Sequence, residues 1–155
     1  MLDGMALELK PMGPERVAAY LADAKADYIA ELIRAGRSQE VARENADKSM
    51  DSAFADGKPI GRNELFDLVD GDSTVGILWL GPQDEATWWV IDIEIEPEHR
   101  RKGYGRDAMV LAEKRARELG MPYLGLNVFG HNPNARALYA SLGYETTSEQ
   151  MRKAL

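Results

Sequence analysis

Cysteine is absent from this chain of 155 residues, and histidine occurs only at positions 99 and 131. The absence of cysteine excludes disulfides, thiolate zinc sites and a cysteine nucleophile. Two separated histidines without carboxylates at ligand spacing do not make a metal site, so we expect no metal cofactor. The sequence also lacks a signal-peptide pattern and any apolar run near the roughly 20 residues of a membrane helix. We therefore expect a cytoplasmic protein without a membrane partner.

Positive charge is scarce in the first two thirds of the chain. The net charge is −7, from 19 Lys/Arg and 26 Asp/Glu. The segment from Glu98 onward holds ten Lys/Arg and six Asp/Glu, a net of +4, which leaves −11 for residues 1–97. Such an acidic chain is a poor partner for nucleic acid, which requires a basic surface. The basic part suits a small anionic ligand, and the acidic part either attracts a cation or is an ordinary solvated surface.

The pattern of apolar and turn residues predicts one α/β domain over residues 1–155, with residues 1–6 disordered. Strands are expected at residues 6–10, 64–69, 74–80, 87–96, 123–129 and 144–152. Helices are expected at residues 14–36, 38–54, 104–119 and from Asn132 or Asn134 to residue 142, with a loop at 56–63. This order predicts a mixed sheet with an antiparallel front half and a βαβ back half.

A cationic glycine turn follows the strand predicted at residues 87–96. Gly103 and Gly105 let the backbone approach a ligand closely, and the N–H groups of the turn and helix start can bind phosphate oxygens. Residues 103–108 also match the dinucleotide pattern G-x-G-x-x-A. However, the following strand has no acidic residue for a ribose, and only roughly 50 residues remain for a second nucleotide-binding half. Both features disfavour an enzyme that uses NAD.

Two longer patterns give a better match. Residues 100–105, RRKGYG, fit [Q/R]-x-x-G-x-[G/A] after a strand that ends in Ile95-Glu96-Pro97. Residues 126–144, LNVFGHNPNARALYASLGY, fit L-x-V-x-x-x-N-x-x-A-x-x-L-Y-x-x-x-G-[FY]. The patterns have the order and spacing of the GNAT superfamily of N-acetyltransferases, which the chain resembles from about Leu7 to its end. The resemblance implies a GNAT-like acyl-CoA N-acyltransferase fold, in which the parallel strands near Ile95 and Val128 part to admit the cofactor arm.

The same resemblance implies that acetyl-CoA is the co-substrate and gives a role to each matching residue. The main chain at Ile93 and Ile95 would pair with the pantetheine arm, and an N–H group there would polarise the thioester carbonyl. Asn132 would contact the arm, and Tyr139 would lie near the sulfur. Backbone amides from Arg101 to Arg106 would hold the pyrophosphate. The cofactor-binding turn as a whole consists of Arg100, Arg101, Lys102, Gly103, Tyr104, Gly105 and Arg106.

The residues also indicate how acetyl transfer would proceed. Without cysteine, an acetyl-cysteine route is impossible, so direct attack by the amine in a ternary complex is the simplest mechanism. Tyr139 is the candidate acid, since a phenol with a pKa of about 10 can donate a proton to a departing thiolate. Its alternative role is to pack a helix against the sheet. Asp92 and Glu94 alternate with Ile91, Ile93 and Ile95, which places both carboxylates on one strand face as candidate bases or as solvated groups.

The sequence therefore predicts transfer of an acetyl group to a primary amine. The acceptor is a small molecule or an amine of a peptide or protein. Some relatives that acetylate protein N-termini carry Glu where this chain has Asn127, so that particular activity is not implied. A non-catalytic acyl-CoA-binding module and an acyltransferase with a longer acyl group are the alternatives. Homodimers are frequent in the family, although no segment of this chain demonstrates one.

Overall fold

The computed structural model describes residues 6–155, so the disorder predicted for residues 1–6 lies outside the described residues except at Ala6. Two helices follow the first strand, a run of strands comes next, and helices and strands alternate only in the C-terminal part. Their order is β1 (Leu7–Pro11), α1 (Pro14–Arg34), α2 (Gln39–Ala53), β2 (Phe54–Ala55), β3 (Lys58–Pro59), β4 (Glu64–Asp70), β5 (Ser73–Pro82), β6 (Thr87–Ile95), α3 (Tyr104–Glu118), β7 (Tyr123–Leu126) and α4 (Pro133–Ser141). No helix within this described part is long and apolar enough to cross a membrane.

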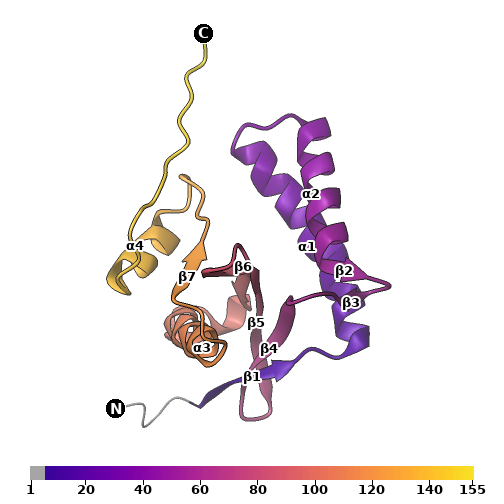
Figure 1. Cartoon of the computed structure of the whole chain (residues 1–155), viewed down its shortest axis with the longest axis vertical. Coiled ribbons are helices and arrows are strands. Elements are labelled where there is room, and N and C mark those ends of the chain that lie inside the picture. Colours follow the sequence, from indigo (N-terminus) through magenta and orange to yellow (C-terminus); the bar gives the residue numbers. More distant parts are fainter. Residues whose placement is uncertain (1–5) are drawn as a thin grey trace.

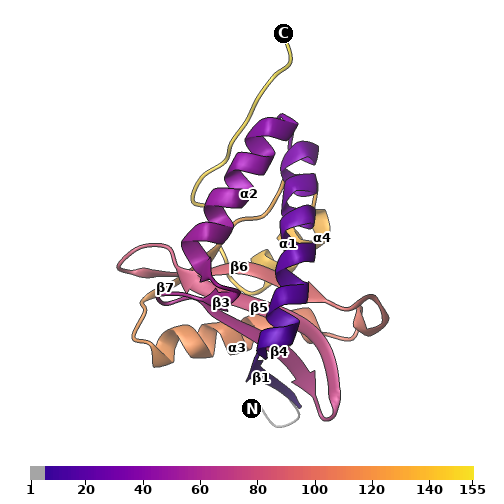
Figure 2. The same ribbon diagram turned by 90° about the vertical axis from the view of Figure 1, so that its right-hand side faces the viewer.

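One five-stranded sheet organises the fold, in the order β1-β4-β5-β6-β7. The first four strands pair antiparallel, and β6 and β7 pair in parallel. Helices α1 and α2 lie side by side on one face, and α3 covers the other (Figures 1 and 2). The mixed α/β architecture is the one that the sequence predicts.

Each face of the sheet has its own apolar core. Leu68, Leu78 and Trp88 pack with the alanine-rich face of α3, where Ala108, Ala112 and Ala116 allow a close approach. On the opposite face, Ile77 and Trp79 of β5 pack with residues of α1 and with Phe54. Alternate residues of a strand point to opposite faces, so β5 supplies both cores and is buried along most of its length.

Local chemistry fixes the helix ends where the sequence predicts them. Pro14 begins α1, and Gly36 follows its end with φ of 92°, a left-handed conformation that favours glycine. The Ser38 hydroxyl caps α2 by accepting a hydrogen bond from the Val41 N–H group at 3.2 Å. Asn132 is the N-cap of α4 and accepts from the Ala135 N–H group.

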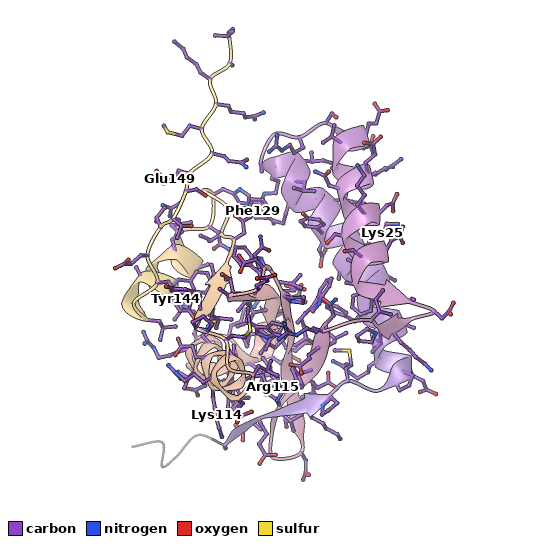
Figure 3. The ribbon with its side chains drawn as sticks, viewed as in Figure 1. Lys25, Lys114, Arg115, Phe129, Tyr144 and Glu149 are labelled. Carbon is purple, nitrogen blue, oxygen red and sulfur yellow. The ribbon has the colours of Figure 1, made fainter. Side chains whose placement is uncertain are left out.

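Three predicted elements differ from the structure. The loop expected at residues 56–63 contains half of a small antiparallel pair, β2 with β3. Strand β7 ends at Leu126 rather than at residue 129. The strand predicted at residues 144–152 is wrong, because this segment pairs with no strand in the described part of the chain. It runs outward past Glu149 and is held by side chains: Arg37 donates to Gln150, and Arg152 donates to the Gly36 carbonyl (Figure 3).

Candidate active site

A bulge in β6 determines which side chains face α1. The register with β5 shifts so that Trp79 pairs with Asp92 and Leu80 pairs with Val90, which leaves Ile91 as the extra residue. Ile91 consequently packs in the α1-side core, whereas Ile93 and Ile95 pack against the α3-side core. The three isoleucines therefore do not share one face, although they alternate with the carboxylates in the sequence. Period-two alternation fails at a bulge, because two successive residues there face the same side.

Asp92 and Glu94 share the α1-facing side of β6, as the sequence predicts. Their cross-strand neighbours are Trp79 and Ile77, and both of these belong to the α1-side core. Bulges are common beside active sites because they redirect a side chain without ending the strand. After the bulge, the side chain of Asp92 points toward α1, and the side chain of Glu94 lines a cavity.

The pairing between β6 and β7 ends at Val90 and Leu126. The two strands therefore part before Ile95 and Val128, earlier than the sequence indicates. The Glu96 N–H group donates to the Val75 carbonyl of β5 at 2.8 Å. Successive residues of a strand direct their backbone N–H and C=O groups to opposite sides, so those of Ile93 and Ile95 point away from β5. The Ile95 carbonyl instead accepts from Arg100 Nε at 2.9 Å. This stretch of β6 presents an open backbone edge that an extended ligand can pair with.

The glycine turn leads directly into the N-terminus of α3. Gly103 is the N-cap, with φ of 88°, and no side chain caps this end within the described residues. The first amides of a helix have no intrahelical acceptor and carry the positive end of its dipole. Arg101 also has a positive φ, of 63°, so the turn directs successive amides to one side. The local backbone thus has exposed, converging amides at the helix start, and anion binding there stays a prediction.

The charged and aromatic side chains of this turn have different surroundings. Arg106 donates to the Ser141 hydroxyl of α4 at 2.6 Å, and the Tyr104 hydroxyl donates to Asp70 at 2.6 Å. Both side chains thus tie the turn to neighbouring elements. Arg101 and Lys102 are exposed and add positive charge at the surface. Gly105 lies in the first turn of α3, where a methyl group would meet only Leu138 at ordinary contact distance, 3.6 Å.

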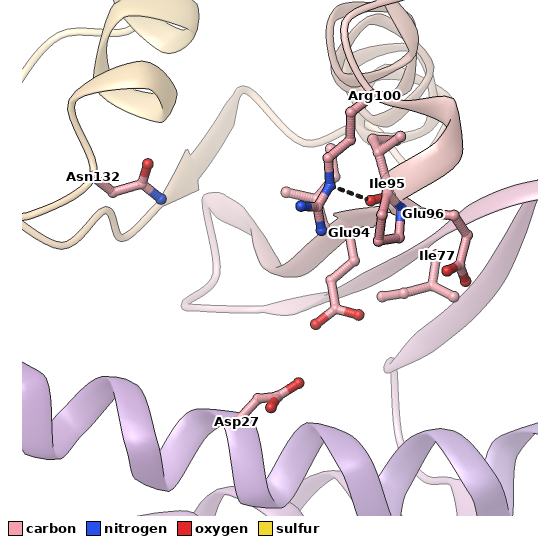
Figure 4. Close-up of a pocket in the computed structure, with 9 residues that line it drawn as sticks. Asp27, Ile77, Glu94, Ile95, Glu96, Arg100 and Asn132 are labelled. Atoms are coloured by element: carbon pink, nitrogen blue, oxygen red, sulfur yellow. Dashed lines mark hydrogen bonds between the residues drawn. The ribbon is translucent and has the colours of Figure 1, made fainter.

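Two adjoining cavities lie between α1 and β6, and Figure 4 shows the larger one. The larger, about 560 Å³, extends from Asp27 of α1 to Asn132 at the start of α4. The smaller, about 160 Å³, is lined by Tyr20 and Asp23 of α1. Both share Ile77, Glu94 and Glu96. Carboxylates therefore dominate the space beside the open edge of β6, and Glu94 and Asp27 point toward one another across it.

Glu94 has the electrostatic properties of a base that works near neutral pH. Loss of hydration, followed by the negative charges of Asp92, Asp27 and Glu96, raises its pKa to about 7. Arg100 opposes the shift. Although much of the residue is exposed at the cavity, its carboxylate lies among like charges that favour the protonated form. A carboxylate with a pKa near the working pH exchanges protons efficiently.

Asp92 lies deeper and has a partner that the sequence does not reveal. Burial raises the pKa of Asp92, while hydrogen bonds from the Tyr20 hydroxyl and the Ile93 N–H group lower it. The Tyr20 bond spans 2.6 Å between α1 and β6. Neither Tyr20 nor Asp27 is identifiable as a site residue from the sequence. The sequence pattern in this region is the recurrence of apolar residues every three to four positions of α1. This pattern predicts a helix but does not indicate which of its polar residues face β6.

Helix α4 brings Tyr139 and Asn132 to the site. Tyr139 is half-buried against the α3-side core, with the ring of Tyr144 at 6.1 Å between centroids. Burial and the negative charge of Asp92 raise the pKa of Tyr139, so its phenol keeps its proton. Asn132 serves two purposes, since it caps α4 and also lines the larger cavity. The fold thus brings a protonated phenol, a carboxylate base and an open strand edge to one region.

The described residues thus form an α/β domain with an uncapped helix start after a glycine turn, a pair of parallel strands that part, and titratable side chains beside them. Comparison with known proteins agrees. The model of the GNAT acetyltransferase family matches residues 22–144, and the chain belongs to this family. YycN of Bacillus subtilis (strain 168), an N-acetyltransferase described as uncharacterized, is 32% identical over 161 residues, which span 97% of this chain and 100% of YycN.

A second relative supports the same assignment, and solved structures share the fold. YdgE of Bacillus subtilis (strain 168), also an N-acetyltransferase described as uncharacterized, is 29% identical and aligns with 97% of this chain and 99% of its own length. The crystal structure of YycN superposes with a TM-score of 0.85, at 28% identity over 96% of this chain and 98% of that one. The aminoglycoside acetyltransferase AAC(6')-Iy, solved with a CoA-containing bisubstrate analogue, shares the fold alone, with a TM-score of 0.56 and 11% identity over 96% of this chain and 97% of that one.

Proposed function

We propose that this protein transfers an acetyl group from acetyl-CoA to a primary amine that carries a further positive charge. Membership of the family supports acetyl transfer. The observation that carries the choice of acceptor is the cavity beside β6, lined by Asp27, Glu94 and Glu96. Carboxylates at the wall of a cavity attract ammonium groups and repel anions. Among the described residues of the same wall, the basic one is Arg100, which follows β6 on the side of the glycine turn.

The residues present fit acetyl-CoA. The amides from Arg101 to Arg106 would hold its pyrophosphate, because they form an uncapped helix start with positive dipole charge. The open backbone of Ile93 and Ile95 would pair with its pantetheine arm, and Asn132 would contact that arm from α4. When bound, the thioester supplies an activated acyl carbon and a thiol leaving group.

The side chains then have complementary roles. Glu94 takes a proton from the ammonium group of the acceptor, directly or through water, and so frees the lone pair that attacks the acyl carbon. Tyr139 donates its phenolic proton to the departing sulfur. Asp27 and Glu96 hold the second cation of the acceptor. Glu94 must be ionised to take the proton and binds it well because its pKa is about 7, whereas Tyr139 must keep its proton until the thiolate forms, which its raised pKa favours.

Acetyl-CoA-dependent thiol release tests this function, and the absence of cysteine removes any thiol background from the protein. The panel consists of diamines and polyamines, aminoglycosides, amino acids and short peptides. We expect release with acceptors that have two or more cationic groups and little with anionic ones. Preference for longer acyl groups would indicate the alternative acyltransferase. CoA binding without release for any acceptor would contradict the proposal and favour a non-catalytic module.

Replacing Asp27 by Asn should raise the KM for a diamine by about fivefold, and that for a monoamine by much less. The reason is that one ion pair in a partly solvated cavity contributes on the order of 1 kcal/mol to binding, which is a factor of about five. Steady-state kinetics with the two acceptors measures the difference. Glu44→Gln, the same loss of charge on the exposed surface of α2, is the matched control. Equal changes for both acceptors would contradict a role in binding the second cation.

Two alanine substitutions in the glycine turn should separate folding from cofactor binding. Gly103→Ala should lower the free energy of unfolding by about 1–2 kcal/mol, because its φ of 88° disfavours any side chain. Gly105→Ala should raise it by about 0.5–1 kcal/mol, since Ala favours the helix. Gly105→Ala should nevertheless weaken CoA binding about tenfold by crowding the pyrophosphate. Chemical denaturation and calorimetric CoA titration check both, and unchanged CoA affinity in Gly105→Ala would place the pyrophosphate elsewhere.

A further inference from the structure

A partly buried hydrogen bond joins α1 to β6 beside the acid–base groups, and the mechanism above gives its donor no part. The Tyr20 hydroxyl donates to Asp92 Oδ2 at 2.6 Å. We propose that Tyr20 is a positioning residue of the acyl-transfer site, whose phenol holds Asp92 as a carboxylate facing α1 and thereby keeps Glu94 ready to accept a proton. This inference rests on the proposed function, since it takes Glu94 as the base.

The geometry gives Asp92 few other donors. The bulge at Ile91 and the pairing with Trp79 place its side chain under α1, where Tyr20 meets it. The Ile93 N–H group is the second donor to Asp92. Burial, followed by the charge of Asp92 and its hydrogen bond, raises the pKa of Tyr20, so the phenol remains a donor throughout the working pH range. A buried carboxylate is stable as an anion only while such donors compensate its lost hydration.

The basic groups around the two carboxylates are already engaged. Arg16 of α1, which lines the smaller cavity, forms an ion pair with Asp67 at 2.7 Å. Arg100 faces Glu94 from the turn after β6, but its Nε donates to the Ile95 carbonyl. The other titratable neighbours among the described residues are acidic or neutral. They are Asp23 and Asp27 from α1, Glu96 directly after β6 and Tyr139 from α4.

This arrangement determines the direction in which the pKa of Glu94 should change when the hydrogen bond from Tyr20 is lost. Asp92 and Glu94 repel one another when both are anions, and one proton bound by either carboxylate removes this repulsion. The hydrogen bond from Tyr20 favours the charged form of Asp92, so the shared proton goes to Glu94. Without that bond, Asp92 takes the proton more readily and no longer repels a charge on Glu94. The pKa of Glu94 should then fall from about 7 toward its ordinary 4.5, while that of Asp92 rises.

Carbon-13 NMR titration of the side-chain carboxyl groups in the full chain tests this directly, without any acceptor or cofactor. Tyr20→Phe should move the Glu94 midpoint downward and the Asp92 midpoint upward. Tyr28→Phe, the same change two turns further along α1, is the matched control and should move neither. A purely structural Tyr20 would lower the melting temperature but leave the Glu94 midpoint in place, and that result would overturn the proposal.

Asp92→Asn provides a second test that does not depend on how well Tyr20→Phe folds. Asn keeps an oxygen that can accept from Tyr20 but carries no charge, so the Glu94 midpoint should fall as it does in Tyr20→Phe. Adding Tyr20→Phe to Asp92→Asn should then move it no further, because Tyr20 acts through Asp92. An unchanged midpoint in Asp92→Asn, or an additional shift in the double variant, would overturn the proposal.

Kinetics separates this inference from the proposed function. With an acceptor found in the thiol-release panel, the acid limb of the kcat/KM profile should move to lower pH in Tyr20→Phe by the same interval as the NMR midpoint. If the parent protein releases no thiol with any acceptor, the proposed function fails while the NMR result still decides the link between Tyr20 and Glu94. If the midpoint moves but the acid limb does not, Tyr20 has no positioning role in the reaction and the proposal fails.

Discussion

Replacing Glu94 by Gln is expected to lower kcat/KM by about 10²–10³-fold at pH 8, because general base catalysis is typically worth this much. In the parent enzyme kcat/KM should decline about tenfold per pH unit below a midpoint near 7, where Glu94 takes up its proton. Gln cannot accept that proton, so this acid limb should disappear along with the lost rate. Steady-state kinetics from pH 5.5 to 9 with a diamine acceptor measures both effects.

Glu96→Gln is the matched control for this experiment, since Glu96 lines the same cavities two residues further along. It removes one negative charge that raises the pKa of Glu94. The acid limb should therefore persist and move to lower pH, with kcat reduced much less than in Glu94→Gln. An acid limb that survives in Glu94→Gln would show that another group, with Asp92 the next candidate, is the base.

The same residue should oppose stability at high pH. The pKa of Glu94 is about 7 in the folded protein against 4.5 as its ordinary value, so the folded state binds the additional proton between these limits. Stability from this group is therefore greatest at pH values below 4.5 and is lost as the pH rises through 7. Glu94→Gln should accordingly raise the melting temperature at pH 8 relative to the parent, and the gain should vanish near pH 4. This pattern is typical of active sites, where function and stability conflict.

Local chemistry made much of the fold predictable. Ser38, Pro14 and Gly36 define helix ends through contacts within a few residues, so the sequence alone places them correctly. Gly103 is predictable for the same reason, because a positive φ before a helix requires glycine. The order of strands and helices follows from these ends and from the apolar periodicity between them.

Features that depend on a neighbouring element were not predictable. The bulge at Ile91 arises from the register between β5 and β6, and no residue of β6 alone announces it. The strand expected after Tyr144 needs a pairing partner, which the described structure does not provide for it. Tyr20 and Asp27 belong to the site because α1 crosses above β6, a tertiary arrangement that helical periodicity leaves open. The sequence thus identified the strand-borne carboxylates and missed the helix-borne groups that surround them.

Replacing Tyr139 by Phe should lower kcat by about 10²-fold and leave the affinity for CoA nearly unchanged. The phenol is the only part removed, and the described structure gives its oxygen no protein partner, so the packing of α4 should survive. Burial and the charge of Asp92 raise the pKa of Tyr139 above its usual 10, so the parent enzyme should show no loss of activity up to about pH 10 from this group. Pre-steady-state thiol release and calorimetric CoA titration measure the two quantities separately.

Tyr144→Phe is the appropriate control, because it removes the same atom from the adjacent ring. The Tyr144 hydroxyl donates to Glu113 of α3 at 3.2 Å, away from the open edge of β6. Its loss should lower stability slightly and leave kcat within about twofold. A Tyr139→Phe variant that retained the parental kcat would assign Tyr139 to packing alone. Proton transfer to the sulfur would then come from solvent, and catalysis would depend on Glu94 and on the backbone donors of β6.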